Sequence, residues 1–205
     1  PFYLYKNSIR NIHQHYFLYY FIFLCYYICI LQERYFIMIN DFENIDIIAL
    51  VNSEDDRQVV KDLILKDTSN SCFSNKDIEG NIIPIEDMAN IYLEYTKMYG
   101  VRLDSIYIGL LSLTNENEVS IFIVPDFQNM GLGKKVLLKF LKIIHREFNL
   151  EEFVGEVTPD NIRCIKTLSN IGFSEVPNES RFVPINGNDT LVKKYKLNYR
   201  NVTNK

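Results

Sequence analysis

Residues 121–134 read IFIVPDFQNMGLGK, a short apolar run that ends at a proline, followed by a polar turn with two glycines. Apolar and basic residues then alternate at helical spacing and predict a long amphipathic helix over residues 132–148. Glycines let a backbone approach a ligand closely, and the first turn of a helix offers unpaired N–H groups at the positive end of its dipole. The stretch therefore predicts a strand, a tight turn and a helix whose beginning binds an anion.

The composition is that of a globular protein. The chain has 205 residues, of which 47% are hydrophobic and 23% charged, enough for one domain with a real core. A formal net charge of −4 provides no field for a nucleic acid, so we expect no such partner. The four cysteines have neither metal-ligand spacing nor the density of a disulfide framework. We therefore expect free thiols, no metal and a cytoplasmic protein.

Residues 1–37 differ from the rest of the chain. They hold more than half of the 14 tyrosines, and residues 16–31 contain no charged side chain. Three interpretations stay open: a membrane anchor slightly shorter than the usual span, a packed extra helix, or a segment that is not part of the native protein. The last follows from the absence of methionine before Met38. A signal peptide is not favoured, because no small-residue cleavage site appears.

From residue 38 onward the apolar pattern predicts a mixed α/β domain. An apolar strand over residues 45–51 precedes a helix that Asn52 or Ser53 caps, and a polar loop over residues 66–80 follows it. Three extended segments in a row suit antiparallel hairpins. The expected later elements are a helix over residues 86–95, extended segments over residues 97–102, 105–114, 118–125 and 152–158, a helix from residue 161 that Gly172 ends, and closing strands over residues 173–176 and 190–197.

Two motifs resemble the signatures of the GNAT superfamily of N-acetyltransferases. Residues 121–134 resemble its acyl-CoA-binding motif, in which [Q/R]-x-x-G-x-[G/A] opens a helix behind a strand. Residues 161–173, NIRCIKTLSNIGF, resemble its second signature, N-x-x-[S/A]-x-x-x-[L/Y]-x-x-x-G-F. The Leu168 form of this signature is most similar to the branch that acetylates ribosomal-protein N-termini and to related small-amine acetylases.

The resemblance covers about residues 106–197 and implies the GNAT fold, a mixed, mostly antiparallel central sheet of about six to seven strands flanked by helices. Residues 38–205 are then an acetyltransferase domain that moves an acetyl group from acetyl-CoA to a primary amine by direct attack in a ternary complex. The amine belongs to a protein N-terminus or a small molecule, and a homodimer is left open. The alternative is a non-catalytic acyl-CoA-binding or regulatory module, because Leu168 replaces a tyrosine that several relatives use as an acid.

The resemblance also implies which residues bind the cofactor. Backbone N–H groups of residues 129–134 hold the pyrophosphate of coenzyme A, and residues 121–123 pair with the pantetheine arm as an added strand does. A backbone N–H near residue 123 polarises the acetyl carbonyl. The expected set is Ile121, Phe122, Ile123, Gln128, Asn129, Met130, Gly131, Leu132, Gly133, Lys134 and Asn161.

Acetyl transfer to an amine needs a base, since only the neutral amine attacks. Glu118 begins the strand that leads to the glycine turn, where many family members carry an acid. Glu156 lies five residues before Asn161, where the ribosomal-protein acetylases carry one. Both are candidate catalytic residues, and either is alternatively a solvated strand residue. The sequence names no general acid.

Overall fold

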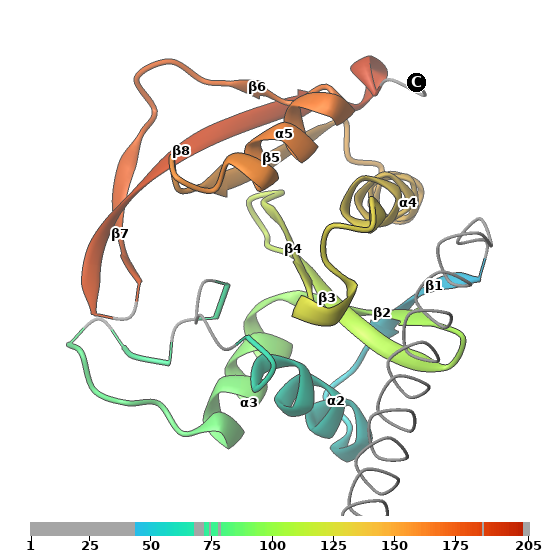
Figure 1. Ribbon diagram of the computed structural model, residues 1–205, viewed down its shortest axis with the longest axis vertical. Helices are drawn as coiled ribbons and strands as arrows, with labels where there is room; N and C mark the ends of the chain where they lie inside the picture. Colours follow the sequence, from blue (N-terminus) through green and yellow to red (C-terminus); the bar gives the residue numbers. More distant parts are fainter. Residues whose placement is uncertain (1–43, 68–71, 74, 78, 186, 203–205) are drawn as a thin grey trace, which may run out of the picture. The chain divides into compact units, whose positions relative to one another are not determined.

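The computed structural model describes residues 44–67, 72–73, 75–77, 79–185 and 187–202 (Figure 1). The interpretations of residues 1–37 as an anchor or an extra helix lie outside these residues. None of the helices in the described part has the length and apolarity that a membrane span requires. All the elements below belong to the unit of the chain that begins at Asn44.

The first sheet contains four antiparallel strands in chain order. They are β1 (Ile45–Leu50), β2 (Lys97–Leu103), β3 (Ile106–Leu113) and β4 (Val119–Ile123). Asp104 and Ser105 join β2 to β3 with φ values of 47° and 77°, the geometry of a two-residue hairpin turn. The three consecutive extended segments expected from the sequence are therefore confirmed.

The second sheet is built around β8 (Asn188–Asn198), with β5 (Glu152–Val157) on one side and β6 (Ser174–Glu175) on the other. A further strand, β7 (Arg181–Ile185), pairs antiparallel with the first half of β8. The sequence did not predict β7, because most of its residues are exposed and Pro184 interrupts the pattern. The mixed, mostly antiparallel α/β class is confirmed, but the strands form two four-stranded sheets in place of one with six to seven strands.

The two sheets meet where β4 and β5 begin. Glu118 and Val154 form a single parallel bridge, and Val154 N donates to Asn117 O at 2.9 Å. Beyond this point β4 pairs only with β3, and β5 pairs only with β8. Figure 1 shows β5 and β4 separating from each other toward the turn that precedes α4. The strands therefore leave a gap with one unpaired edge on each side.

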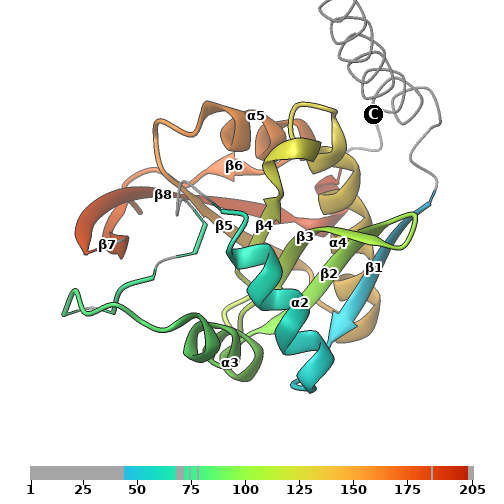
Figure 2. The ribbon, with the colours of Figure 1, turned by 60° about the horizontal axis from the view of Figure 1, so that its bottom comes forward.

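Helices cover both faces of the first sheet. The helix α4 (Leu132–Phe148) packs on one face, where Phe140 meets Tyr99 of β2 with ring centroids 5.0 Å apart. The helices α2 (Glu54–Ile64) and α3 (Ile85–Tyr95) pack on the other face, as Figure 2 shows. Ser53 caps α2, because its hydroxyl accepts a hydrogen bond from Asp56 N. The helix α5 (Ile162–Ile171) follows β5 and lies beside α4.

Candidate active site

Alternate residues of β4 present their backbone to the gap. Thr114 N donates to Glu118 O at 3.0 Å, and the same side of the strand bonds to β3 again at Val124, whose N–H donates at 2.9 Å. In an antiparallel pair every second residue bonds to the partner strand, so the residues between them face the other way. Ile121 and Ile123 therefore direct their N–H and C=O groups into the gap, as expected for the strand that pairs with a ligand.

Phe122 lies between these two residues and is out of phase with them. Its backbone pairs with Leu110 of β3, and its buried ring meets Phe73 edge to face with centroids 5.3 Å apart. The sequence grouped Phe122 with Ile121 and Ile123, but the pleat of the strand does not bring its backbone to the gap. Phe122 instead contributes a wall on the α3 side of the sheet.

Gln128 ends the short 3₁₀ turn between β4 and α4. Its side-chain Nε2 donates to Ile123 O at 2.7 Å, across the loop that the two residues enclose. This bond occupies the Ile123 carbonyl and leaves the Ile123 N–H facing the gap. Gln128 thus acts on the end of β4 rather than projecting into open space.

The turn before α4 has the backbone that its residues predict. Asn129 and Gly131 both have left-handed φ values, 63° and 75°, and Gly131 caps the helix without a side-chain hydrogen bond. The first amides of α4, including those of Leu132 and Gly133, have no partner within the helix because of their position. Together with the helix dipole they have the geometry that an anion site requires.

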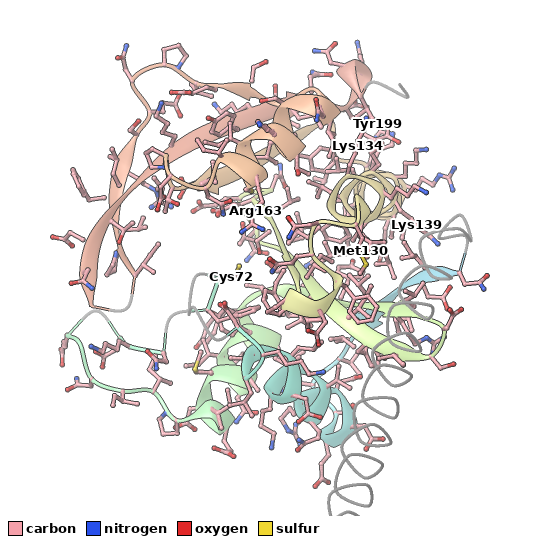
Figure 3. The ribbon with its side chains drawn as sticks, in the orientation of Figure 1. Cys72, Met130, Lys134, Lys139, Arg163 and Tyr199 are labelled. Carbon is pink, nitrogen blue, oxygen red and sulfur yellow. The ribbon has the colours of Figure 1, made fainter. Side chains whose placement is uncertain are left out.

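Residues of α5 approach the same turn. Arg163 Nη1 donates to Asn129 Oδ1 at 3.0 Å, and Figure 3 shows Arg163 pointing from α5 toward the loop that carries Met130. Lys134 lies in the first turn of α4 and is half-buried. A fixed guanidinium beside the helix N-terminus adds positive charge where an anion would lie. The sequence analysis did not single out Arg163.

Asn161 caps α5 with its carbonyl. Its Oδ1 accepts a hydrogen bond from Cys164 N at 3.1 Å, which leaves the Nδ2 amide as a donor at the wall of the cavity described below. Leu168 is buried, and its methyl groups lie 3.6–3.7 Å from the space that a Cβ on Gly155 would occupy. Leu168 is therefore a packing contact between α5 and β5, and no proton donor.

A cavity of about 310 Å³ extends from the gap to the α3 face of the sheet. Both predicted catalytic glutamates and Asn161 line it, so the structure brings these three together. Among the described residues no group of His, Cys, Asp or Glu side chains is arranged to hold a metal ion. The other side chains that matter below are Phe73, Tyr92, Ser112, Ser120, Phe122, Cys164, Val183 and Ile185.

Glu118 has no ion-pair partner within the described residues, although the charges of Arg181 and Lys194 act on it from a distance and lower its pKa in part. No described residue donates a hydrogen bond to its carboxylate, and burial, followed by the nearby charge of Glu156, raises its pKa above the ordinary value. Ser120, two residues further along β4, shares the same face and forms a short hydrogen bond with Ser112 of β3. A half-buried carboxylate beside two hydroxyls is suited to accept a proton near neutral pH.

Glu156 is held by a partner from β7. Arg181 Nε donates to Oε1 and Oε2 of Glu156 at 2.9 and 3.1 Å, and Nη2 donates to Oε2 at 2.8 Å. The side chain of Glu156 is only 11% exposed. The guanidinium of Arg181 therefore matches the charge of Glu156 and occupies both of its carboxylate oxygens. The two glutamates therefore differ in what they can do.

Several residues in and beside the cavity were not predicted from the sequence. Arg181, which binds Glu156 in the cavity wall, was missed with its strand. The cavity residues Phe73 and Tyr92 lie in a loop and in the helix that follows it, and neither sequence pattern indicates a pocket. Ser112 and Ser120 did leave a signal, because each is a polar residue inside an otherwise apolar strand segment. Such interruptions indicate a face that is open to solvent or to a ligand.

A model of the family described as acetyltransferase (GNAT) domain matches residues 47–174, well over half of the chain. The chain belongs to the GNAT acetyltransferase family. The fold and activity class expected from the two motifs are thereby confirmed, with acetyl-CoA as the co-substrate of an N-acetyltransferase. A search for similar curated proteins found none.

Solved structures with the same fold include spermidine N-acetyltransferase from Vibrio cholerae. Its complex with CoA and spermine is 18% identical, with a TM-score of 0.62, and the match covers 77% of this chain and 97% of that chain. A dodecameric structure of the Vibrio cholerae enzyme is 20% identical, with a TM-score of 0.59 and coverage of 76% and 94%. At this identity the likeness concerns the fold of the GNAT domain.

Proposed function

We propose that this GNAT domain transfers the acetyl group of acetyl-CoA directly to a primary amine, with Glu118 as the general base. The observation that supports this most is Glu118 itself, an unpaired and half-buried carboxylate at the point where β4 and β5 separate. Its raised pKa makes it a better proton acceptor near neutral pH than an exposed glutamate. Glu156 has the weaker case, because its charge is matched by Arg181.

The cofactor is proposed to lie along the gap. The amides of residues 131–134 would bind the pyrophosphate at the N-terminus of α4, with Arg163 beside it. The backbone groups of Ile121 would pair with the pantetheine arm, and the Nδ2 amide of Asn161 would bind the same arm from the opposite wall. These contacts would bring the thioester close to Glu118.

The reaction needs three things from the chain. The amine nitrogen, after losing a proton to Glu118, attacks the thioester carbonyl carbon, and the Ile123 N–H stabilises the negative charge that develops on the oxygen. The intermediate then collapses and the C–S bond breaks. Coenzyme A leaves as a thiolate and takes up the excess proton that the nitrogen still carries, which gives the amide and the free thiol. A thiol pKa near 8.5 allows departure without a strong acid, which suits a site with Leu168 in place of tyrosine.

We also propose a family branch, a cellular location and an oligomeric state for this protein. The Leu168 form of the second motif supports membership of the ribosomal-protein N-terminal acetyltransferase branch. The thiol of Cys164, which forms no disulfide, supports a cytoplasmic location. The dodecameric state of the Vibrio cholerae relative supports self-association, with a homodimer as the smallest unit, and sedimentation of the purified chain tests it.

Release of coenzyme A thiol from acetyl-CoA, measured over a panel of primary amines and peptide N-termini, tests the function. We expect amine-dependent release and a rise in melting temperature with millimolar acetyl-CoA, because a ligand that binds only the folded state must stabilise it. A thermal shift without transfer to any amine would favour the non-catalytic acyl-CoA-binding module. No thermal shift would refute the cofactor assignment itself.

A further inference from the structure

The part of the cavity beyond the cofactor path lies on the α3 side of β4. The backbone groups of Ile121 and Ile123 face the gap. Glu118, Ser120 and Phe122 alternate with them along β4, so their side chains share one face of the strand. The acceptor amine must reach the thioester from this side, because the cofactor occupies the other. The side chains found here therefore select the acceptor.

The charge available at this place is one carboxylate. Among the described residues that line the cavity the acidic ones are Glu118 and Glu156. Arg181 matches the charge of Glu156 with three hydrogen bonds. An acceptor with one ammonium group finds a partner in Glu118, but a second ammonium at the same depth finds none.

Apolar side chains form the rest of the wall. Phe73 meets Tyr92 edge to face with centroids 5.4 Å apart and meets Phe122 in the same way, which gives three rings on one side. From the opposite side β7 contributes Val183 and Ile185 to the lining. Burial of an unpaired charge against such a surface is costly, while burial of hydrocarbon is favourable.

We propose that the acceptor is a primary monoamine with an apolar body, bound through its single ammonium by Glu118 and through its hydrocarbon by the Phe73, Tyr92 and β7 walls. The inference rests on the proposed acetyl transfer and deepens it. It sets this site apart from one that binds a polyamine, since a polyamine needs several unpaired carboxylates or open solvent at its other nitrogens. Free aralkylamines and apolar N-terminal residues of peptides both have this chemistry.

Butylamine and 1,4-diaminobutane form a matched pair of probes, because they differ only in a second ammonium group. With acetyl-CoA and the full chain we expect kcat/KM for butylamine to exceed that for the diamine by at least about tenfold, the cost of one poorly paired charge. Equal values or a preference for the diamine would overturn the proposal. Attraction of the second ammonium group by the aromatic rings would produce that result.

The Arg181→Met variant provides the reciprocal test. It frees the charge of Glu156 and should raise the diamine-to-monoamine ratio of kcat/KM by about tenfold. The ratio within one variant cancels any general loss of folding or activity. Arg200→Met is the matched control, since Arg200 is 83% exposed and pairs with Glu151 at 3.7 Å, and its ratio should stay that of the wild type. An unchanged ratio in Arg181→Met would also overturn the proposal.

Two further experiments show whether the amine belongs to a small molecule or to a peptide, and they test this proposal separately from the proposed function. We expect both 2-phenylethylamine and a peptide amide that begins with phenylalanine to exceed butylamine in kcat/KM, and the better of the two indicates the source. If both are worse than butylamine, the apolar wall does not bind the acceptor. If no amine is acetylated, calorimetric titration of the coenzyme A complex with butylamine and the diamine still measures the preference, and binding of neither probe counts against it.

Discussion

Arg181 on β7 binds both carboxylate oxygens of Glu156 on β5, with donor–acceptor distances of 2.8–3.1 Å. The pair crosses β8, because β8 pairs with β5 on one side and with β7 on the other. It divides the two glutamates of the cavity into one whose charge is matched and one, Glu118, whose charge is not. This difference sets the direction of the predictions for the two glutamates.

Glu118→Gln should stabilise the fold at neutral pH. Burial and Glu156 raise the pKa of Glu118 in the folded state above its ordinary value, so the folded protein holds this proton more tightly than the unfolded chain does. Ionising Glu118 therefore lowers the free energy of unfolding. This loss is absent at a pH below the pKa of Glu118 in the unfolded chain, grows as the pH rises through its pKa in the folded protein, and is constant above that. Glutamine causes no such loss.

Thermal unfolding of the wild type and Glu118→Gln across pH 4–8 measures this effect. The variant should melt higher at pH 7, and the difference should shrink toward pH 4. Glu156→Gln is the matched control and should melt lower at pH 7, because it leaves Arg181 without its partner. A Glu118→Gln variant that is less stable than the wild type at pH 7 would contradict the assigned environment.

The two glycines of the turn should respond differently to alanine. Gly131 has a φ of 75°, so alanine there costs about 1–2 kcal/mol although nothing lies within 4 Å of the new Cβ. Gly133 is helical, and its added Cβ would meet Thr167 Cγ2 at an ordinary 3.8 Å. Gly133→Ala should therefore be neutral or stabilise by about 0.5 kcal/mol.

Denaturant unfolding and coenzyme A titration of both variants separate the two roles. Gly133→Ala should keep the affinity for coenzyme A, since its Cβ points to α5. Gly131→Ala should lose affinity along with stability, because the turn that aims the first amides of α4 is strained. Equal loss of affinity in both variants would show that the ligand approaches Gly133 more closely than its neighbours indicate.

Asn161 has one observed role and one proposed role, which substitution can separate. Its Oδ1 caps α5 by accepting from Cys164 N, and its Nδ2 amide is proposed to bind the pantetheine arm. Asn161→Asp keeps the cap and removes the donor, so stability should hold while KM for acetyl-CoA rises about tenfold, the loss of one hydrogen bond. Asn161→Ala should lose about 1 kcal/mol of stability as well.

Steady-state kinetics and thermal unfolding on the same preparations check this. If Asn161→Asp leaves KM for acetyl-CoA unchanged and only Asn161→Ala is affected, the residue is a helix cap and no cofactor ligand.

The cofactor side of the site could be predicted from short stretches of sequence. The turn at residues 128–131 needs left-handed backbone, and asparagine and glycine supply it at positions 129 and 131. The amphipathic pattern of α4 and the Asn161 cap of α5 also act over short distances, so their positions could be predicted. Each of these features depends on residues within one or two turns of the chain.

The acceptor side depends on contacts that no short pattern encodes. Arg181 reaches Glu156 across 25 positions and from a strand that is mostly exposed, so neither the strand nor the ion pair was predicted. Phe122 was grouped with Ile121 and Ile123 because strand phase is set by the β3–β4 register, which the sequence does not show, and a shift by one residue exchanges the two faces. Rings such as Phe73 and Tyr92 meet only after tertiary packing.

Glu118→Gln should lower the rate of acetyl transfer roughly 10²-fold near neutral pH while leaving coenzyme A affinity unchanged, because glutamine keeps the shape but accepts no proton. The wild-type rate should fall as pH drops through the raised pKa of Glu118. At high pH the two enzymes should converge, since an amine that is already neutral needs no base. Glu156→Gln should have a smaller effect and no change in pH profile, because hydrogen bonds from Arg181 already occupy that carboxylate. Initial rates over pH 6–10 with one amine decide between them. If neither substitution alters the profile, the enzyme uses no carboxylate base and works by positioning the amine against the thioester.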